Sequence, residues 1–152
     1  MTRSKNSEQL ASTILDAMQQ LRLDRMGSTL KSSLAMPDQD MSRLEWLWSL
    51  LEPQVRSLAE RRIERRIRDA RLPARKTLAA FDFAFQPTID QNLIMELASL
   101  RFLDEGTNVL LAGMSGTGKS HIAMALAMEA CVANRRVIYT TSANLLATLN
   151  AA

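Results

Sequence analysis

Eight consecutive residues, GMSGTGKS at positions 113–120, combine three glycines with a lysine and hydroxyl side chains. Their spacing matches the pattern G-x-x-x-x-G-K-[ST] of a phosphate-binding loop, in which glycines with positive φ bring consecutive backbone N–H groups around one anion. Lys119 would reach the β- and γ-phosphates and stabilise their charge, and the Ser120 hydroxyl would ligate Mg²⁺. The predicted contacts to the nucleotide are Gly113, Met114, Ser115, Gly116, Thr117, Gly118, Lys119, Ser120 and His121.

Such a loop needs a buried strand before it and a helix after it. Residues 108–112, NVLLA, are a short apolar run that predicts a buried parallel strand. After Ser120, apolar side chains recur at helical spacing without proline or glycine, which predicts a helix whose N-terminus attracts anions. The alternative is a glycine-rich turn that carries Lys-Ser by chance, and both flanks argue against it. His121 could approach a phosphate, or it could simply be a partly exposed histidine at the helix start.

The composition is that of a soluble globular protein, with 47% hydrophobic and 23% charged residues among 152. This length fits one domain, or a small domain plus part of another. The longest apolar run, Ile122–Met128, is too short to span a bilayer, and no apolar segment follows the N-terminal charges as in a secretory signal. A single cysteine, Cys131, cannot form an intrachain disulfide. We therefore expect a cytoplasmic protein without membrane contact, in which Cys131 is a small buried residue.

Basic residues are concentrated between positions 56 and 76. This segment holds nine basic and three acidic residues, a net charge of +6 in a chain whose total is +3. One interpretation is a solvated helix surface with i,i+4 pairs such as Glu64–Arg68 and Arg65–Asp69. Because pairing absorbs only three charges, we favour contact with the phosphates of DNA, largely independent of base sequence. The candidate DNA contacts are Arg61, Arg62, Arg65, Arg66 and Arg68.

Apolar periodicity predicts helices over residues 8–36, 44–67 and 88–103 and from Ser142 onward, with a second strand over 136–140. A second helix within the first of these ranges should begin after Gly27 or just before it, and Pro37-Asp38 should end it.

The long helix over 44–67 carries its own signals. Ser42 and Glu45 are spaced as a capping box at its start. Pro53 predicts a kink or break near Leu51–Glu52. Trp46 and Trp48 cannot both face one core, so one of them should be partly exposed.

These elements divide into a basic helical module for DNA or partner binding over residues 1–72, a connector over 73–87, and the first part of a domain with the phosphate-binding loop over 88–152. The connector is bounded by prolines and holds three of the four phenylalanines.

Three stretches together resemble the IstB-like ATP-binding proteins of insertion sequences: LPARKTLAAFDF, EGTNVLLAGMSGTGKSHIAMALAMEA and RRVIYTTSANLL. The resemblance covers the chain from about Ala17 onward. It implies an AAA+ ATPase, similar to helicase loaders of the DnaC type, that binds ATP and Mg²⁺. It also implies a protein that oligomerises on DNA through a helical N-terminal part and engages a transposase during DNA transposition. Met114-Ser115 departs from the family, where many relatives carry proline, but the glycines and lysine are kept.

A P-loop ATPase also needs an acidic residue at the end of a later strand. The stretch Leu103-Asp104-Glu105 does not supply this acidic residue, because it precedes the loop and leaves no room for a βαβ crossover. Family relatives continue further, so we expect an incomplete α/β P-loop NTPase fold behind an all-α module, binding ATP without hydrolysing it.

Two other functions remain open. A replicative helicase loader would share the fold, and a P-loop kinase would share only the loop. The arginine-rich segment argues against the kinase.

Overall fold

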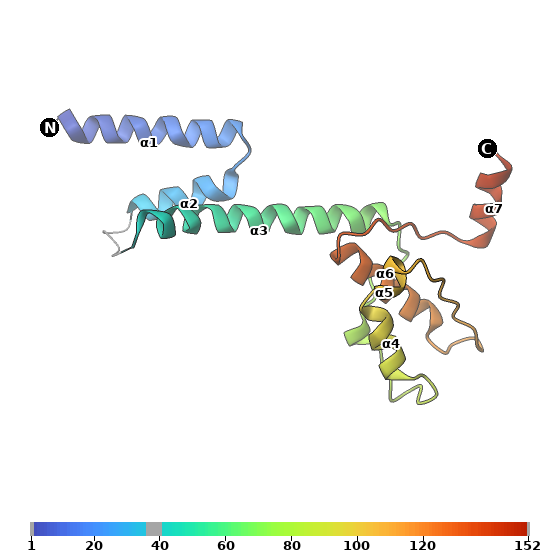
Figure 1. Ribbon diagram of the computed structural model, residues 1–152. Helices are drawn as coiled ribbons and strands as arrows, with labels where there is room; N and C mark the ends of the chain where they lie inside the picture. Colours follow the sequence, from blue (N-terminus) through green and yellow to red (C-terminus); the bar gives the residue numbers. More distant parts are fainter. Residues whose placement is uncertain (1, 36–40, 152) are drawn as a thin grey trace. The chain divides into compact units, whose positions relative to one another are not determined.

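A computed structural model describes residues 2–35 and 41–151, with side chains from residue 8 onward (Figure 1). The elements in chain order are α1 (Thr2–Gln20), α2 (Asp24–Ala35), α3 (Arg43–Asp69), the 3-10 helix η1 (Leu78–Ala80), α4 (Gln91–Ala98), α5 (Arg101–Asp104), α6 (Lys119–Val132) and α7 (Ser142–Asn150). No helix in these ranges combines the length and the apolar composition needed to cross a bilayer. The chain forms two compact units, Met1–Arg62 and Ile63–Ala152.

In the first unit, α1 and α2 confirm the prediction of two helices before residue 36. The turn between them lies at Arg22, which has a φ of 58°. Leu23 N–H donates to the Met18 carbonyl at 2.8 Å, the bond that closes a Schellman-type helix end. Helix α2 thus begins just before Gly27, as expected. The predicted stop at Pro37-Asp38 lies outside the described residues.

The predicted capping box at the start of α3 is confirmed. Ser42 N–H donates to Glu45 Oε2 at 2.8 Å, and Glu45 N–H donates to Ser42 Oγ at 3.2 Å. Of the kink or break predicted near Leu51–Glu52, the break is wrong, because α3 continues through Pro53 as one helix (Figure 1). The backbone hydrogen bond that a proline removes is offset here by packing, since both Leu50 and Gln54 are buried.

Trp46 and Gln54 join α3 to α2 by hydrogen bonds. Trp46 and Trp48 are both partly exposed, and Trp46 Nε1 donates to Ser33 Oγ at 2.9 Å. Gln54 is only 5% exposed. Its Oε1 accepts from the N–H groups of Arg25 (3.1 Å) and Met26 (3.3 Å). These N–H groups belong to the first turn of α2, which has no intrahelical acceptor for them, so Gln54 caps α2 from α3.

In the second unit, α6 packs against two apolar clusters. Ile67, Ala70 and Cys131 form one of them. The other contains Ile94, Ile122 and Leu126, with connector side chains against it. Cys131 is fully buried, and this burial raises the pKa of its thiol, so the nucleophilic thiolate is disfavoured. The prediction of a small buried cysteine is therefore confirmed.

The helix predicted over 88–103 is divided into α4 and α5. Asp90 caps α4 by accepting from the N–H groups of Asn92 (2.9 Å) and Leu93 (3.3 Å), so the helix begins at Gln91. Leu100 interrupts the pattern with a φ of 61°. Its side chain is buried, which compensates for the strain of a left-handed residue. Tertiary packing thus overrides the apolar periodicity at this point.

The two predicted strands are not formed among the described residues, so the α/β prediction is not confirmed by this structure. A strand requires a ladder partner, and residues 108–112 and 136–140 exchange no backbone hydrogen bonds with each other. Within the described structure, the backbone hydrogen bond of residues 136–140 goes elsewhere: Tyr139 N–H donates to the Ala70 carbonyl at 2.8 Å. Leu110 is 90% exposed as a result. Helix α7 begins at Ser142 as predicted, capped by the Thr141 hydroxyl.

We predict that Gln54→Leu destabilises the Met1–Arg62 unit by about 1–3 kcal/mol, because two partly buried N–H groups lose their acceptor without a large change in volume. Urea unfolding would measure this loss, and hydrogen exchange at the Arg25 and Met26 amides should accelerate. Gln20→Leu, at an exposed position of α1, is the matched control and should change stability by less than about 0.5 kcal/mol. Equal stability of the two variants would contradict the capping role of Gln54.

Candidate phosphate-binding loop and basic helix

The GMSGTGKS segment forms a loop that leads directly into α6. Gly113, Gly116 and Gly118 have φ values of 149°, 82° and 85°. Gly118 is the N-cap of α6 and has a left-handed backbone conformation, which residues other than glycine adopt only with strain. The pattern therefore predicts both the positive φ of the loop and the helix behind it correctly.

The backbone of this loop offers hydrogen-bond donors. Within the described residues, the N–H groups of positions 115–118 donate to no protein acceptor. They are followed by the first N–H groups of α6, which have no intrahelical acceptor and lie at the positive end of the helix dipole. A run of such donors at a helix start suits an anion such as a phosphate group.

Lys119 supplies the cation of this loop. Its ammonium group donates to the Met114 carbonyl and, at 3.3 Å, to Thr117 Oγ1. Thr117 Oγ1 in turn donates to the Met114 carbonyl at 3.0 Å. These partners are neutral, and in the described residues Lys119 forms no ion pair. A phosphate entering the loop would therefore compete only with neutral acceptors for this charge.

Ser120 is exposed in the first turn of α6, next to Lys119. Its hydroxyl oxygen is the kind of hard ligand that Mg²⁺ accepts, provided that phosphate oxygens and water complete the coordination shell. The donor set of this loop therefore fits both a phosphate chain and its metal ion.

His121 faces the connector through its Nε2. This atom lies 2.9 Å from the Thr77 carbonyl, and the imidazole meets the Phe81 ring edge-on with centroids 5.2 Å apart. Of the two roles that the sequence leaves open, phosphate contact or a partly exposed helix start, the observed contacts resemble the second. Phe81 and Thr77 could not be predicted as neighbours of the loop, because a contact across more than thirty residues leaves no local signal in the sequence.

The five candidate DNA contacts all lie on α3, but they differ in exposure. Arg61, Arg62, Arg65 and Arg68 are exposed. Arg66 is half-buried, and its charge lies close enough to Cys131 to influence the pKa of that thiol, although burial has the larger effect. Arg66 is therefore the least accessible of the five.

Glu64 forms an ion pair other than those of the solvated-surface interpretation. Glu64 binds Arg75 through two hydrogen bonds of 2.9 and 2.7 Å. These bonds lower the pKa of the Glu64 carboxyl group and raise the pKa of the Arg75 guanidinium. The Glu64–Arg68 and Arg65–Asp69 pairs do not occur in the described structure. Glu64 reaches the connector instead, where a bidentate guanidinium is available.

Asp104, in the acidic stretch that precedes the loop, lies in α5 and pairs with Arg135. Both side chains are exposed. Asp104 is thus engaged in a surface ion pair.

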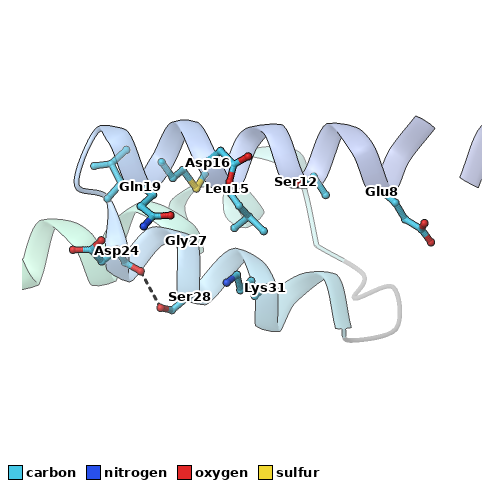
Figure 2. A pocket seen from close by; sticks show the side chains of 12 residues that line it. Glu8, Ser12, Leu15, Asp16, Gln19, Asp24, Gly27, Ser28 and Lys31 are labelled. Atoms are coloured by element: carbon cyan, nitrogen blue, oxygen red, sulfur yellow. Dashed lines mark hydrogen bonds between the residues drawn. The ribbon is translucent and has the colours of Figure 1, made fainter. Parts of the chain in front are cut away.

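A cavity of about 710 Å³ lies in the first unit between α1 and α2 (Figure 2). Charged side chains line it, among them Asp16, Asp24 and Lys31. Ser28 Oγ donates to the Asp24 carbonyl at 2.9 Å beside it, a bond within one helix turn. None of the predicted site residues lines this cavity.

Residues 16–152 match the family of IstB-like ATP binding proteins. The chain is 36% identical over 87% of its length to an ATP-binding protein of insertion sequence IS21 from Pseudomonas aeruginosa, and covers 50% of that protein. It is 36% identical over 70% of its length to an insertion sequence IS5376 protein from Geobacillus stearothermophilus, and covers 43% of it. An insertion-sequence protein of Mycobacterium tuberculosis is 37% identical over 73% of the chain, which covers 45% of that protein.

The chain thus spans about half the length of the curated relatives it matches. The family match includes the loop, the connector and all of α3. This chain belongs to the family of IstB-like ATP binding proteins of insertion sequences.

Proposed function

We propose that this chain binds ATP with Mg²⁺ at residues 113–120 and acts in the cytoplasm as an ATP-dependent helper of DNA transposition. The observation that carries the proposal is the loop itself, with its glycines of positive φ and Lys119 at the start of α6. The family match supports ATP as the ligand, since family and relatives are named for ATP binding. The family also implies a P-loop NTPase fold.

The residues of the loop would share the work of holding the triphosphate. The N–H groups of positions 115–118 would donate to phosphate oxygens, and Lys119 would leave the Met114 carbonyl for the β- and γ-phosphates. Ser120 would supply one ligand of Mg²⁺, which neutralises phosphate charge when bound. Exchange of a neutral carbonyl for a phosphate favours Lys119 in the bound state, because charge-assisted hydrogen bonds are the stronger ones.

We predict that Lys119→Ala weakens ATP binding about ten- to a hundredfold. The variant loses hydrogen bonds from a charged group to the phosphates, which contribute about 1.5–3 kcal/mol. Titration calorimetry would measure the affinity, and circular dichroism should show an unchanged helix content. Lys31→Ala, on an exposed position of α2, is the matched control and should bind ATP as the unmodified chain does. Equal affinities of the Lys119 variant and the unmodified chain would refute this assignment of the loop.

The second part of the proposal is that α3 contacts DNA through the exposed arginines Arg61, Arg62, Arg65 and Arg68. None of these four arginines forms an ion pair in the described structure, whereas Arg56 pairs with Glu52 and Arg75 with Glu64. Guanidinium groups on a helix bind phosphates without reading base edges, so the contact should be largely independent of sequence. Arg66 would contribute less, because it is half-buried.

If these four arginines meet phosphates, log K for duplex DNA should fall with log salt at a slope of about −4, roughly −0.9 for each contact. We predict that replacing Arg61, Arg65 and Arg68 together by alanine flattens this slope by about 3. Fluorescence anisotropy on random duplex DNA between about 50 and 200 mM salt would measure it.

The matched control for this triple variant is Arg56→Ala with Arg75→Ala, which removes two arginines that already have acidic partners. Its slope should change by less than about 1. The same slope in the triple variant and the unmodified chain would show that the arginines form a solvated helix surface and do not contact DNA.

For the partner, we propose the transposase of the same insertion sequence, with homo-oligomers forming on DNA. The support is the origin of the relatives, which come from insertion sequences. A replicative helicase is the competing partner, as in a DnaC-like loader. Purified transposase and helicase, each mixed with the chain, ATP and DNA in size-exclusion chromatography, would distinguish them by which one co-elutes.

A further inference from the structure

The connector lies against the start of α6, where the phosphate loop ends. Its 3-10 helix η1 is capped by Thr77, whose Oγ1 accepts from the Ala80 N–H at 3.3 Å. The Phe81 N–H then donates to the Leu78 carbonyl at 3.1 Å. Leu78, Phe81 and Phe83 pack on the cluster formed by Ile94, Ile122 and Leu126. This short stretch is thus fixed to α6 by its apolar side chains.

A hydrogen bond joins the same stretch to His121. The Thr77 carbonyl can only accept, so His121 Nε2 carries the proton and donates across 2.9 Å. His121 is two residues beyond Lys119, in the first turn of α6. The backbone of the connector is therefore held to the turn that also carries the lysine of the loop.

Phe81 makes the second link. A Cβ atom at Gly118 would overlap the Phe81 ring, with Cζ at 2.8 Å. Gly118 therefore lacks a side chain for two reasons: its φ of 85° and the ring pressed against it. No such neighbour exists at Gly116, where a Cβ would meet nothing within 4 Å. Phe81 also meets Phe83 edge-on at 4.8 Å.

The rest of the loop has few other constraints. In the described residues its internal hydrogen bonds are those that link Lys119, Thr117 and the Met114 carbonyl. The preceding residues 108–112 form no backbone hydrogen bonds within the described structure. The contact of Phe81 with Gly118 and the bond from His121 to Thr77 are thus the links between the loop's C-terminal end and the connector.

We propose that His121 and Phe81 are positioning residues that couple the connector over residues 77–83 to the phosphate loop, so that ATP binding and the ordering of the connector stabilise each other. This inference rests on the proposed binding of ATP at the loop. Such coupling is reciprocal: the free energy by which an ordered connector favours phosphate binding equals the free energy by which bound phosphates favour the ordered connector. Preorganisation of the loop by the connector also reduces the ordering cost of binding.

The first test compares two phenylalanines of one cluster. Phe81→Leu should weaken ATP binding about five- to thirtyfold. Phe83→Leu makes the same change in side-chain volume in the same cluster, but the three atoms nearest to a Cβ at Gly118 all belong to Phe81. Its ATP affinity should stay within about twofold of the unmodified chain, even where both variants lower the melting temperature equally.

The second test uses the hydrogen bond of His121. His121→Ala should weaken ATP binding about five- to thirtyfold, whereas His121→Gln should restore most of the affinity, because its amide nitrogen can donate to the Thr77 carbonyl. Cleavage by trypsin after Lys76, the residue before Thr77, reports on the connector directly. In the presence of saturating ATP it should slow in the unmodified chain and in His121→Gln, but not in His121→Ala.

The outcomes separate this inference from the function on which it rests. If the unmodified chain fails to bind ATP, the proposed function fails and the coupling fails with it. If the unmodified chain binds ATP but Phe81→Leu and Phe83→Leu lose affinity equally, the coupling alone is refuted. The coupling is also refuted if trypsin cleavage after Lys76 responds to ATP equally in His121→Ala and His121→Gln.

Discussion

Helix α6 is buried on two sides at once, and this constraint organises the unit from Ile63 to Ala152. At 100° per residue, Ile122 and Leu126 face one way while Met128 and Cys131 face nearly the opposite way, and each pair belongs to a different apolar cluster. A helix that is apolar on both sides cannot turn or slide without exposing one cluster to water. Its N-terminus is therefore fixed, and the phosphate loop is attached to that end.

The features that depend on neighbours in sequence could be predicted from the sequence. The capping box at Ser42 and Glu45, the helix after Lys119 and the start of α7 at Ser142 each arise from interactions within one or two turns of chain. The glycine pattern of the loop is equally local, because positive φ is a property of the residue itself. For such features the types and spacing of the residues contain the physical cause.

Features that depend on distant residues could not be predicted in this way. Pro53 suggests a break, but the burial of Leu50 and Gln54 keeps α3 continuous. Glu64 has a suitable partner four residues away and binds Arg75 instead. The predicted strands need ladder partners, and the described residues contain none for them. The contact of Phe81 with Gly118 likewise joins residues whose proximity no periodicity indicates.

The exposed apolar side chains of Leu110 and Ile138 have a consequence for handling the protein. Both lie in segments whose backbone groups are largely unpaired in the described structure, and Ile138 is 78% exposed. Extended backbone with open hydrogen-bonding groups and apolar side chains is a template for adding another chain edge to edge. Concentrated solutions of this chain should therefore tend to aggregate through residues 107–112 and 135–140, a tendency that a charged residue at Leu110 or Ile138 would reduce.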